Sequence, residues 1–193
     1  MVLLQVKNQM IRDLIRNTSL LFRFSLISLF VILLIAAGLA WRLESTLEKD
    51  ALQAVAENTA EQANNILDHN LTNTDLKTVL QGQRYQEIDA LIHNTLLSMN
   101  IVRIKIWNRD GLLVYSDDAT IMGKAFPISD ELTKAFSGEI ATEISLLQAE
   151  ENISERGKYT RLYEIYVPIQ PTSTNKVVGV YEVYYDLSKL QPR

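Results

Sequence analysis

The spacing of hydrophobic residues changes several times along this 193-residue chain, and each spacing predicts a different kind of element. From Phe24 to Trp41 the chain has eighteen successive residues without a charged side chain. As a helix this run is about 27 Å long, close to the ~30 Å hydrocarbon core of a bilayer. Within lipid, a single segment satisfies its own backbone only as a helix. Residues 24–41 are therefore predicted to form a transmembrane helix.

Two helical patterns follow this run. Between residues 42 and 68, apolar or small side chains return at steps of three or four, at Leu52, Val55, Thr59, Ala63 and Ile66. We expect one long helix that continues the transmembrane helix outward. A turn cluster at residues 70–75, with Thr74 or Asp75 as the N-cap, precedes a second helix predicted from Leu76 to Met99.

The small residues of the long helix allow two interpretations. Ala56, Ala60 and Ala63 would permit the close approach of another element. That element is either the sheet of the same chain or, in a parallel homodimer, the same helix of a second copy.

After Asn100 the spacing becomes alternating, which is typical of strands. Five strands are predicted, at Ile101–Asn108, Leu112–Ser116, Glu139–Leu147, Thr160–Gln170 and Lys176–Asp186. The Asp-Gly pair that ends Asn108–Gly111 predicts a hairpin turn, and a short helix is expected at Asp130–Phe136. The charged segment Gln148–Lys158 is expected to be exposed. Helices followed by a five-stranded antiparallel sheet define an α+β fold.

Charge predicts the orientation in the membrane. Residues 1–23 carry a net charge of +3, and the remainder carries −7. Positively charged flanks stay in the cytoplasm, so the tail 1–23 is expected to be cytoplasmic and residues 42–187 extracytoplasmic. A cleaved signal peptide is the alternative, with small residues at Gly38-Leu39-Ala40. Against it, the apolar run is longer than a usual signal core of ~7–15 residues.

Composition narrows the function. The chain has no cysteine and two histidines, so no protein-built zinc site is expected. An acidic exported domain offers no electrostatic footprint for nucleic acid. The chain also lacks a phosphate-binding glycine loop and the common hydrolase motifs, so neither a cofactor nor an enzymatic activity is predicted.

The candidate site lies on one face of the predicted sheet. Alternation places Val102, Ile104 and Ile106 of the first strand toward the helices. The opposite face then carries seven polar or aromatic residues from three strands: Arg103, Lys105, Trp107, Glu164, Tyr166, Glu182 and Tyr184.

Two carboxylates on that face should attract a cation. If the last hairpin centres near Ser173, Glu164 lies opposite Glu182, a repulsive pairing that needs a positive neighbour such as Arg103 or Lys105. A cationic pair beside aromatic rings suits a small organic acid ligand. The alternative is a solvated salt-bridge ladder without a ligand. Acid–base catalysis by the two glutamates is a third, weaker interpretation.

Several segments, taken in their order along the chain, resemble those of a known family. They are Ile104–Gly111, Val114–Asp117, Gly123–Pro127, Glu151-Asn152, Glu155-Arg156, Tyr163–Ile169 and Gly179–Tyr184. Together they resemble the PAS-like single-CACHE (PDC) periplasmic sensor domains of bacterial membrane-bound sensor histidine kinases, diguanylate cyclases and HD-type phosphodiesterases.

The resemblance implies a signal-sensing module in the bacterial inner membrane, single-pass over residues 1–193. Residues 188–193 fall where such receptors begin a second membrane helix toward a cytoplasmic output domain, and no output motif is present here. The expected function is therefore ligand sensing for a transmembrane receptor. The alternative is a membrane-tethered interaction or assembly protein that senses no ligand.

Overall fold

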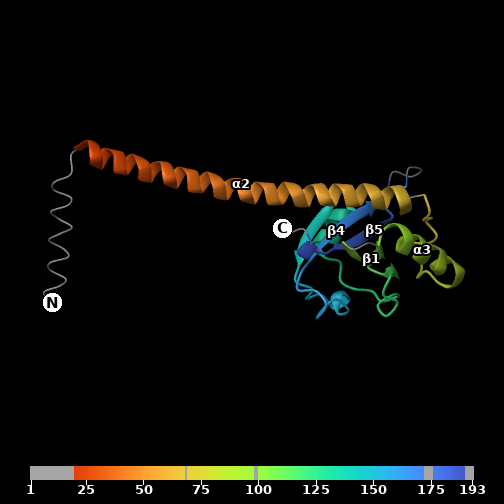
Figure 1. Ribbon diagram of the computed structural model, residues 1–193. Coiled ribbons are helices and arrows are strands. Elements are labelled where there is room, and N and C mark those ends of the chain that lie inside the picture. Colours follow the sequence, from red (N-terminus) through yellow and green to blue (C-terminus); the bar gives the residue numbers. More distant parts are fainter. Residues whose placement is uncertain (1–19, 68, 98–99, 172–175, 190–193) are drawn as a thin grey trace. The chain divides into compact units, whose positions relative to one another are not determined.

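The computed structural model describes residues 20–67, 69–97, 100–171 and 176–189 (Figure 1). Residues 1–19 of the predicted cytoplasmic tail, Met99 of the predicted second helix and residues 190–193 lie outside this part. The chain divides into two compact units, residues 1–52 and 53–193. Helix α2, Leu20–Leu67, runs through the boundary between these units.

In the first unit, the stretch Phe22–Arg42 of α2 is long and apolar enough to cross a membrane. Its mean hydropathy is 2.5, and none of it is buried by the rest of the chain. Side chains such as Phe24 and Trp41 are 72% and 77% exposed. An N-terminal signal sequence can meet the same criteria of length and apolar composition, so the membrane anchor stays a prediction.

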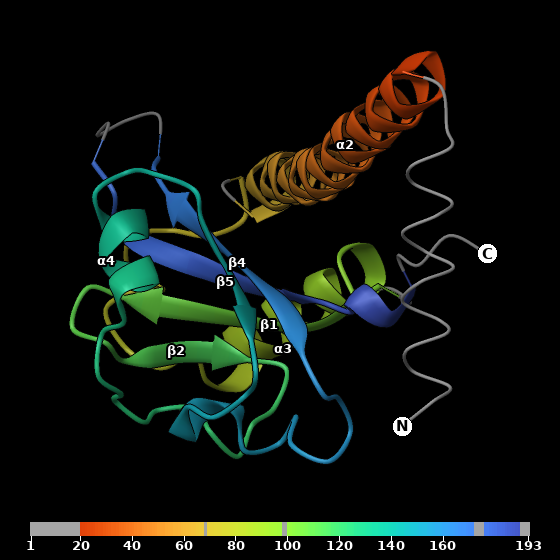
Figure 2. The same cartoon turned by 90° about the vertical axis from the view of Figure 1, so that its left-hand side faces the viewer.

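The second unit is built on a five-stranded antiparallel sheet with the order β2-β1-β5-β4-β3 (Figure 2). Its strands are β1 Ile101–Asn108, β2 Leu113–Ser116, β3 Ala141–Ser145, β4 Leu162–Ile169 and β5 Gly179–Tyr185. The first strand pairs with the last. The predicted α+β fold with its five strands is thus confirmed. Strand β1 has the predicted bounds, and the other four strands are shorter than predicted.

Helices cover one face of this sheet. The last turns of α2 lie along it (Figure 1) and bury Ala56, Ala60 and Ala63. Helix α3, Gly82–Thr95, contacts the same face, where the Tyr115 hydroxyl of β2 donates a 2.9 Å hydrogen bond to Asp89. The three alanines therefore serve packing within the chain. A homodimer through this helix stays a prediction and would need another of its surfaces.

The opposite face, called the outer face below, is covered by α4, Asp130–Phe136. Its Leu132 and Ala135 pack with Trp107, Tyr166 and Val180 of the sheet. The predicted bounds of α4 are confirmed, with the Ser129 hydroxyl accepting a hydrogen bond from the Leu132 amide as N-cap. Because both faces are covered, the central strands β4 and β5 are buried almost throughout.

The second helix starts six residues later than predicted, and Asp75 is not its cap. Asp75 accepts hydrogen bonds from Thr72 and Arg84, which close a separate turn. The Leu80 amide donates to the Val114 carbonyl of β2, so this stretch is tied to the sheet and is not helical. The N-cap is Gln81. Tertiary hydrogen bonds outweighed the local capping pattern here.

The predicted orientation of Val102 is wrong. The pairing of β1 with β5 shifts between Ile101 and Arg103. This bulge, an extra residue on one strand, moves Val102 away from the helices. Val102 packs instead with Leu147, Leu162 and Tyr184. Ile104 and Ile106, after the bulge, are fully buried as expected.

Candidate functional site

All seven predicted site residues are buried on or beside the outer face. Their exposed fractions run from 0% for Lys105 and Tyr184 to 8% for Arg103. A solvated salt-bridge ladder, the alternative considered from the sequence, is therefore wrong. The covering layer is α4 together with residues 148–158, which we call the strap.

The predicted pairing of Glu164 with Glu182 is also wrong. In the sheet Glu164 lies opposite Tyr184 of β5 and opposite Glu143 of β3. Glu182 lies opposite Tyr166 and, on its other side, Lys105. A register change of two residues leaves every side chain on its face. Alternation therefore predicted the correct face but could not predict the partner.

Lys105 is the centre of a buried polar cluster. Its Nζ donates hydrogen bonds to the Tyr184 hydroxyl at 2.6 Å and to Asn152 Oδ1 at 2.7 Å. Its ammonium also lies 4.5 Å from the centre of the Tyr184 ring. The Tyr184 hydroxyl and the Trp107 indole then donate to the two oxygens of Glu182, each at 2.5 Å. Lys105 thus reaches Glu182 through Tyr184.

The second carboxylate of the cluster is held by different donors. Asn152 Nδ2 donates to one oxygen of Glu164 at 3.0 Å, and the Tyr166 hydroxyl donates to the other at 2.7 Å. Burial, with the neighbouring Glu182 charge, raises the pKa of Glu164 to about 7. One ammonium beside two buried carboxylates therefore favours a proton on Glu164 near neutral pH.

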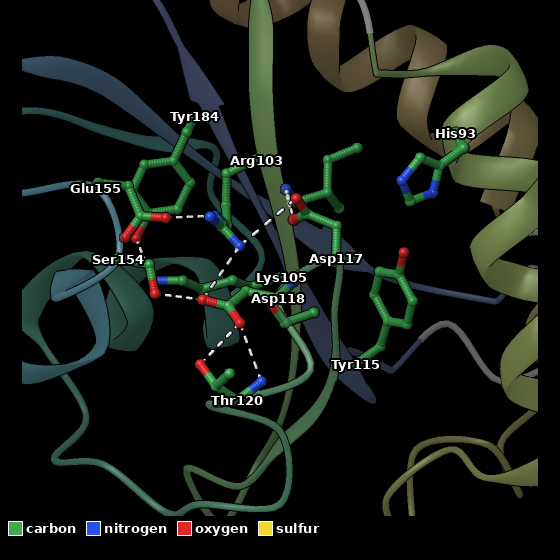
Figure 3. Close-up of polar contacts among 12 residues, drawn as sticks. His93, Arg103, Lys105, Tyr115, Asp117, Asp118, Thr120, Ser154, Glu155 and Tyr184 are labelled. Atoms are coloured by element: carbon green, nitrogen blue, oxygen red, sulfur yellow. Dashed lines mark hydrogen bonds and ion pairs between the residues drawn. The ribbon is translucent and has the colours of Figure 1, made fainter. Parts of the chain in front are cut away.

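Arg103 is not part of the Lys105 cluster. Figure 3 shows its guanidinium between Glu155 of the strap and two aspartates that follow β2. The nitrogen Nη1 lies 3.5 Å from Asp117 and 3.7 Å from Asp118. The predicted cationic pair is thus split, with each cation serving a separate acidic group.

Hydrogen bonds also tie the strap to Asp118. This carboxylate accepts from the Ser154 hydroxyl of the strap and, at 2.7 Å, from the Thr120 hydroxyl (Figure 3). Burial alone would raise the pKa of Asp118, but these bonds lower it to about 2. The aspartate therefore stays charged and keeps its contacts to the strap at physiological pH.

The strap was expected to be exposed, and this expectation is wrong for its central residues. Asn152, at the end of the 3-10 helix Glu150–Asn152, and Glu155 are each 1% exposed. Composition could not find them, because nothing in a charged loop distinguishes an inward side chain from an outward one. The resemblance included Asn152 and Glu155 among its matching segments but gave them no role.

A pocket of about 280 Å³ opens between the strap and the edge of the sheet. Its lining includes Glu143 and Ser145 of β3, Glu164 and Tyr166 of β4, and Asn152 of the strap. Asn152 borders this pocket and also contacts Lys105, so its side chain lies between the pocket and the ammonium.

A larger hollow of about 810 Å³ lies where β1 and β4 end and β5 begins. Arg109, which lines it, already donates to the carbonyls of Val177 and Phe136. This hollow is wide open, and no residue of the buried polar cluster lines it, so we favour the smaller pocket as the functional site. Among the described residues, no group of three or more metal-binding side chains occurs.

Comparisons with known proteins find similarity among solved structures. No protein-family model matches the chain, and no curated protein matches it. Among solved structures, the crystal structure of the sensor domain of DcuS from E. coli is similar, with a TM-score of 0.49 and 20% sequence identity over 75% of this chain and 95% of that chain.

Proposed function

We propose that this chain is the extracytoplasmic ligand-sensing module of a bacterial transmembrane receptor. The buried polar cluster next to the 280 Å³ pocket supports this proposal. Burying ionisable groups is unfavourable unless they are paired and hydrogen-bonded, so a purely structural face would be expected to be apolar. Here Lys105, Glu164 and Glu182 are each at most 2% exposed.

The proposed ligand is a small polar molecule that enters by the pocket. The sequence suggested an organic acid, which would have to reach the ammonium of Lys105 past Asn152. Any catalytic output would belong to a domain outside residues 1–193. A bound ligand would act by favouring one of two conformations of the second unit, which contains the sheet and the pocket. This requires the ligand to bind the two conformations with different affinities.

A membrane-tethered interaction protein is the second candidate, and one observation favours it. The edge strand β3 and its neighbours expose apolar side chains, with Ile140 and Ile144 each 42% and Leu146 64% exposed. Exposed apolar patches of this kind often mark contacts with other proteins. The two candidates differ in whether the pocket binds a small molecule.

A ligand panel tests the proposal. The full chain in detergent micelles would be titrated with small carboxylic acids, carboxamides and amines while the melting temperature is recorded. A ligand of the folded state raises this temperature by mass action. We expect at least one class to raise it by about 2 °C or more, and Glu143→Gln, at the pocket, to change the affinity. Glu139→Gln, on an exposed residue outside the pocket, is the control. No shift across the panel would favour the tether.

A further inference from the structure

One side chain on the outer face has the contacts of a bound molecule. Asn152 belongs to the strap, yet its carboxamide is held entirely by side chains of the sheet. The oxygen Oδ1 accepts from Lys105 Nζ at 2.7 Å and lies 2.6 Å from the Tyr184 hydroxyl. The nitrogen Nδ2 donates to Glu164 at 3.0 Å.

The chemistry of these partners fixes the orientation of the amide. A lysine ammonium can only donate, so it must face the oxygen of Asn152. The amide nitrogen can only donate, so it must face an oxygen of Glu164 that accepts. Lys105 and Glu164 therefore form a subsite for a group that carries an acceptor and a donor on the same carbon, which describes a primary carboxamide.

The position of Asn152 makes it replaceable. It is 1% exposed, but its side chain borders the 280 Å³ pocket. If this side chain moved outward, the pocket would extend to Lys105 and Tyr184. The strap is attached to the rest of the domain through polar contacts, among them Ser154 with Asp118, after β2, and Glu155 with Arg103 of β1. Such contacts can exchange partners without exposing a hydrophobic core.

We propose that Asn152 is a built-in occupant of the ligand site, and that the ligand displaces it with a carboxamide group of its own. This inference rests on the proposed sensing function and names the ligand class. A carboxylate ligand would satisfy Lys105 equally well. However, its second oxygen would meet Glu164. Above the pKa of Glu164, about 7, the ionised side chain repels a carboxylate but accepts a hydrogen bond from an amide.

Removing the occupant tests the inference directly. Asn152→Ala, in the full chain in detergent micelles at pH 8, should lower the melting temperature and leave a vacant carboxamide subsite. Millimolar acetamide should then raise that temperature by about 2 to 4 °C with saturation. Acetate has the same shape, and at equal ionic strength it should have a much smaller effect. Asn152→Ser replaces the alanine variant if that variant does not fold.

Asn108→Ala is the matched control. Asn108 is also a buried asparagine, 6% exposed, but its carboxamide oxygen serves the hairpin turn by accepting from the amides of Asp110 and Leu112. Acetamide should not restore the melting temperature of Asn108→Ala, and it should not raise that of the unaltered chain by a comparable amount. Equal shifts in the Asn108 and Asn152 variants, no shift in the Asn152 variant, or a stronger effect of acetate would each overturn the inference.

The two proposals fail in different ways. A ligand panel that is positive on the unaltered chain, together with no acetamide rescue, would refute the built-in occupant and leave the sensor. If no ligand of the panel stabilised the unaltered chain but acetamide raised the melting temperature of Asn152→Ala, the proposed sensing function would be refuted. Asn152 would then be a permanent part of the polar cluster. Rescue in the variant and binding of a carboxamide by the unaltered chain would support both proposals.

Discussion

The side-chain oxygen of Asn152 lies 2.7 Å from the ammonium nitrogen of Lys105, although 47 residues separate them in the chain. This bond joins the strap to the first strand of the sheet, and both side chains are at most 1% exposed. Tyr184 and Glu164 complete the same hydrogen-bond network. Replacing any one of these side chains should therefore lower the stability of the domain and weaken the attachment of the strap.

Lys105→Met should destabilise the domain by about 2 to 4 kcal/mol, because it leaves two buried carboxylates without their nearest cation. Lys124→Met, at an exposed lysine, should change the free energy of unfolding by less than about 0.5 kcal/mol. Denaturant titration of both variants measures the difference. Equal stability of the two variants would show that the buried ammonium is dispensable.

Stability should fall as the pH rises from 5 to 8. The pKa of Glu164 is raised to about 7 in the folded chain from an ordinary value of 4.5, by burial and by Glu182. The folded state therefore holds a proton that the unfolded state has released. This proton stabilises the fold at pH 5, and its contribution is lost as the pH passes 7. The expected loss is of order 1 to 3 kcal/mol.

Glu164→Gln, which cannot ionise, should flatten this pH dependence, and thermal melts at a series of pH values measure it. Glu139→Gln, at an exposed glutamate, should keep the dependence of the unaltered chain. A stability that rises between pH 5 and 8 in the unaltered chain would contradict the assigned proton. The lowered pKa of Asp75, about 2, acts only at more acidic pH and does not interfere.

Glu155→Gln should loosen the strap without unfolding the domain. Glu155 is the buried partner of Arg103, and the amide cannot replace its charge. The strap carries trypsin sites at Arg156 and Lys158, both exposed. When opening is fast compared with cleavage, the rate follows the population of the open state. We expect cleavage there to be about 5- to 10-fold faster. Glu150→Gln, on an exposed glutamate of the same strap, should cleave at the original rate.

The membrane anchor and its orientation can be tested in cells. Because the chain contains no cysteine, single cysteines can be introduced without background. The protein should remain in the membrane pellet after alkaline carbonate extraction. Lys158→Cys should react with a membrane-impermeant maleimide in spheroplasts, whereas Asn8→Cys should react only after lysis. A protein found in the soluble fraction would contradict the anchor. Labelling of both positions in intact spheroplasts would contradict the predicted orientation.

Patterns in the sequence were sufficient to predict the five strands and, apart from Val102 at the bulge, the faces of their side chains. The period-two alternation of β4 placed Glu164 and Tyr166 on one face, and that of β5 placed Glu182 and Tyr184 there as well. The structure confirms that these four residues meet on the outer face. The short helix α4 and the Asn108–Gly111 turn were also predictable, because local capping and turn preferences decide them.

Contacts between distant segments were decided only by the tertiary structure. The register of β4 against β5, the bulge at Val102 and the separation of Arg103 from Lys105 all preserve the same alternating pattern in the sequence. Asn152 and Glu155 lie in a segment whose composition is that of a surface loop. They are buried because they pair with charged side chains of the outer face. Those charges are brought together and buried only when the sheet assembles, and burying them without partners would be unfavourable.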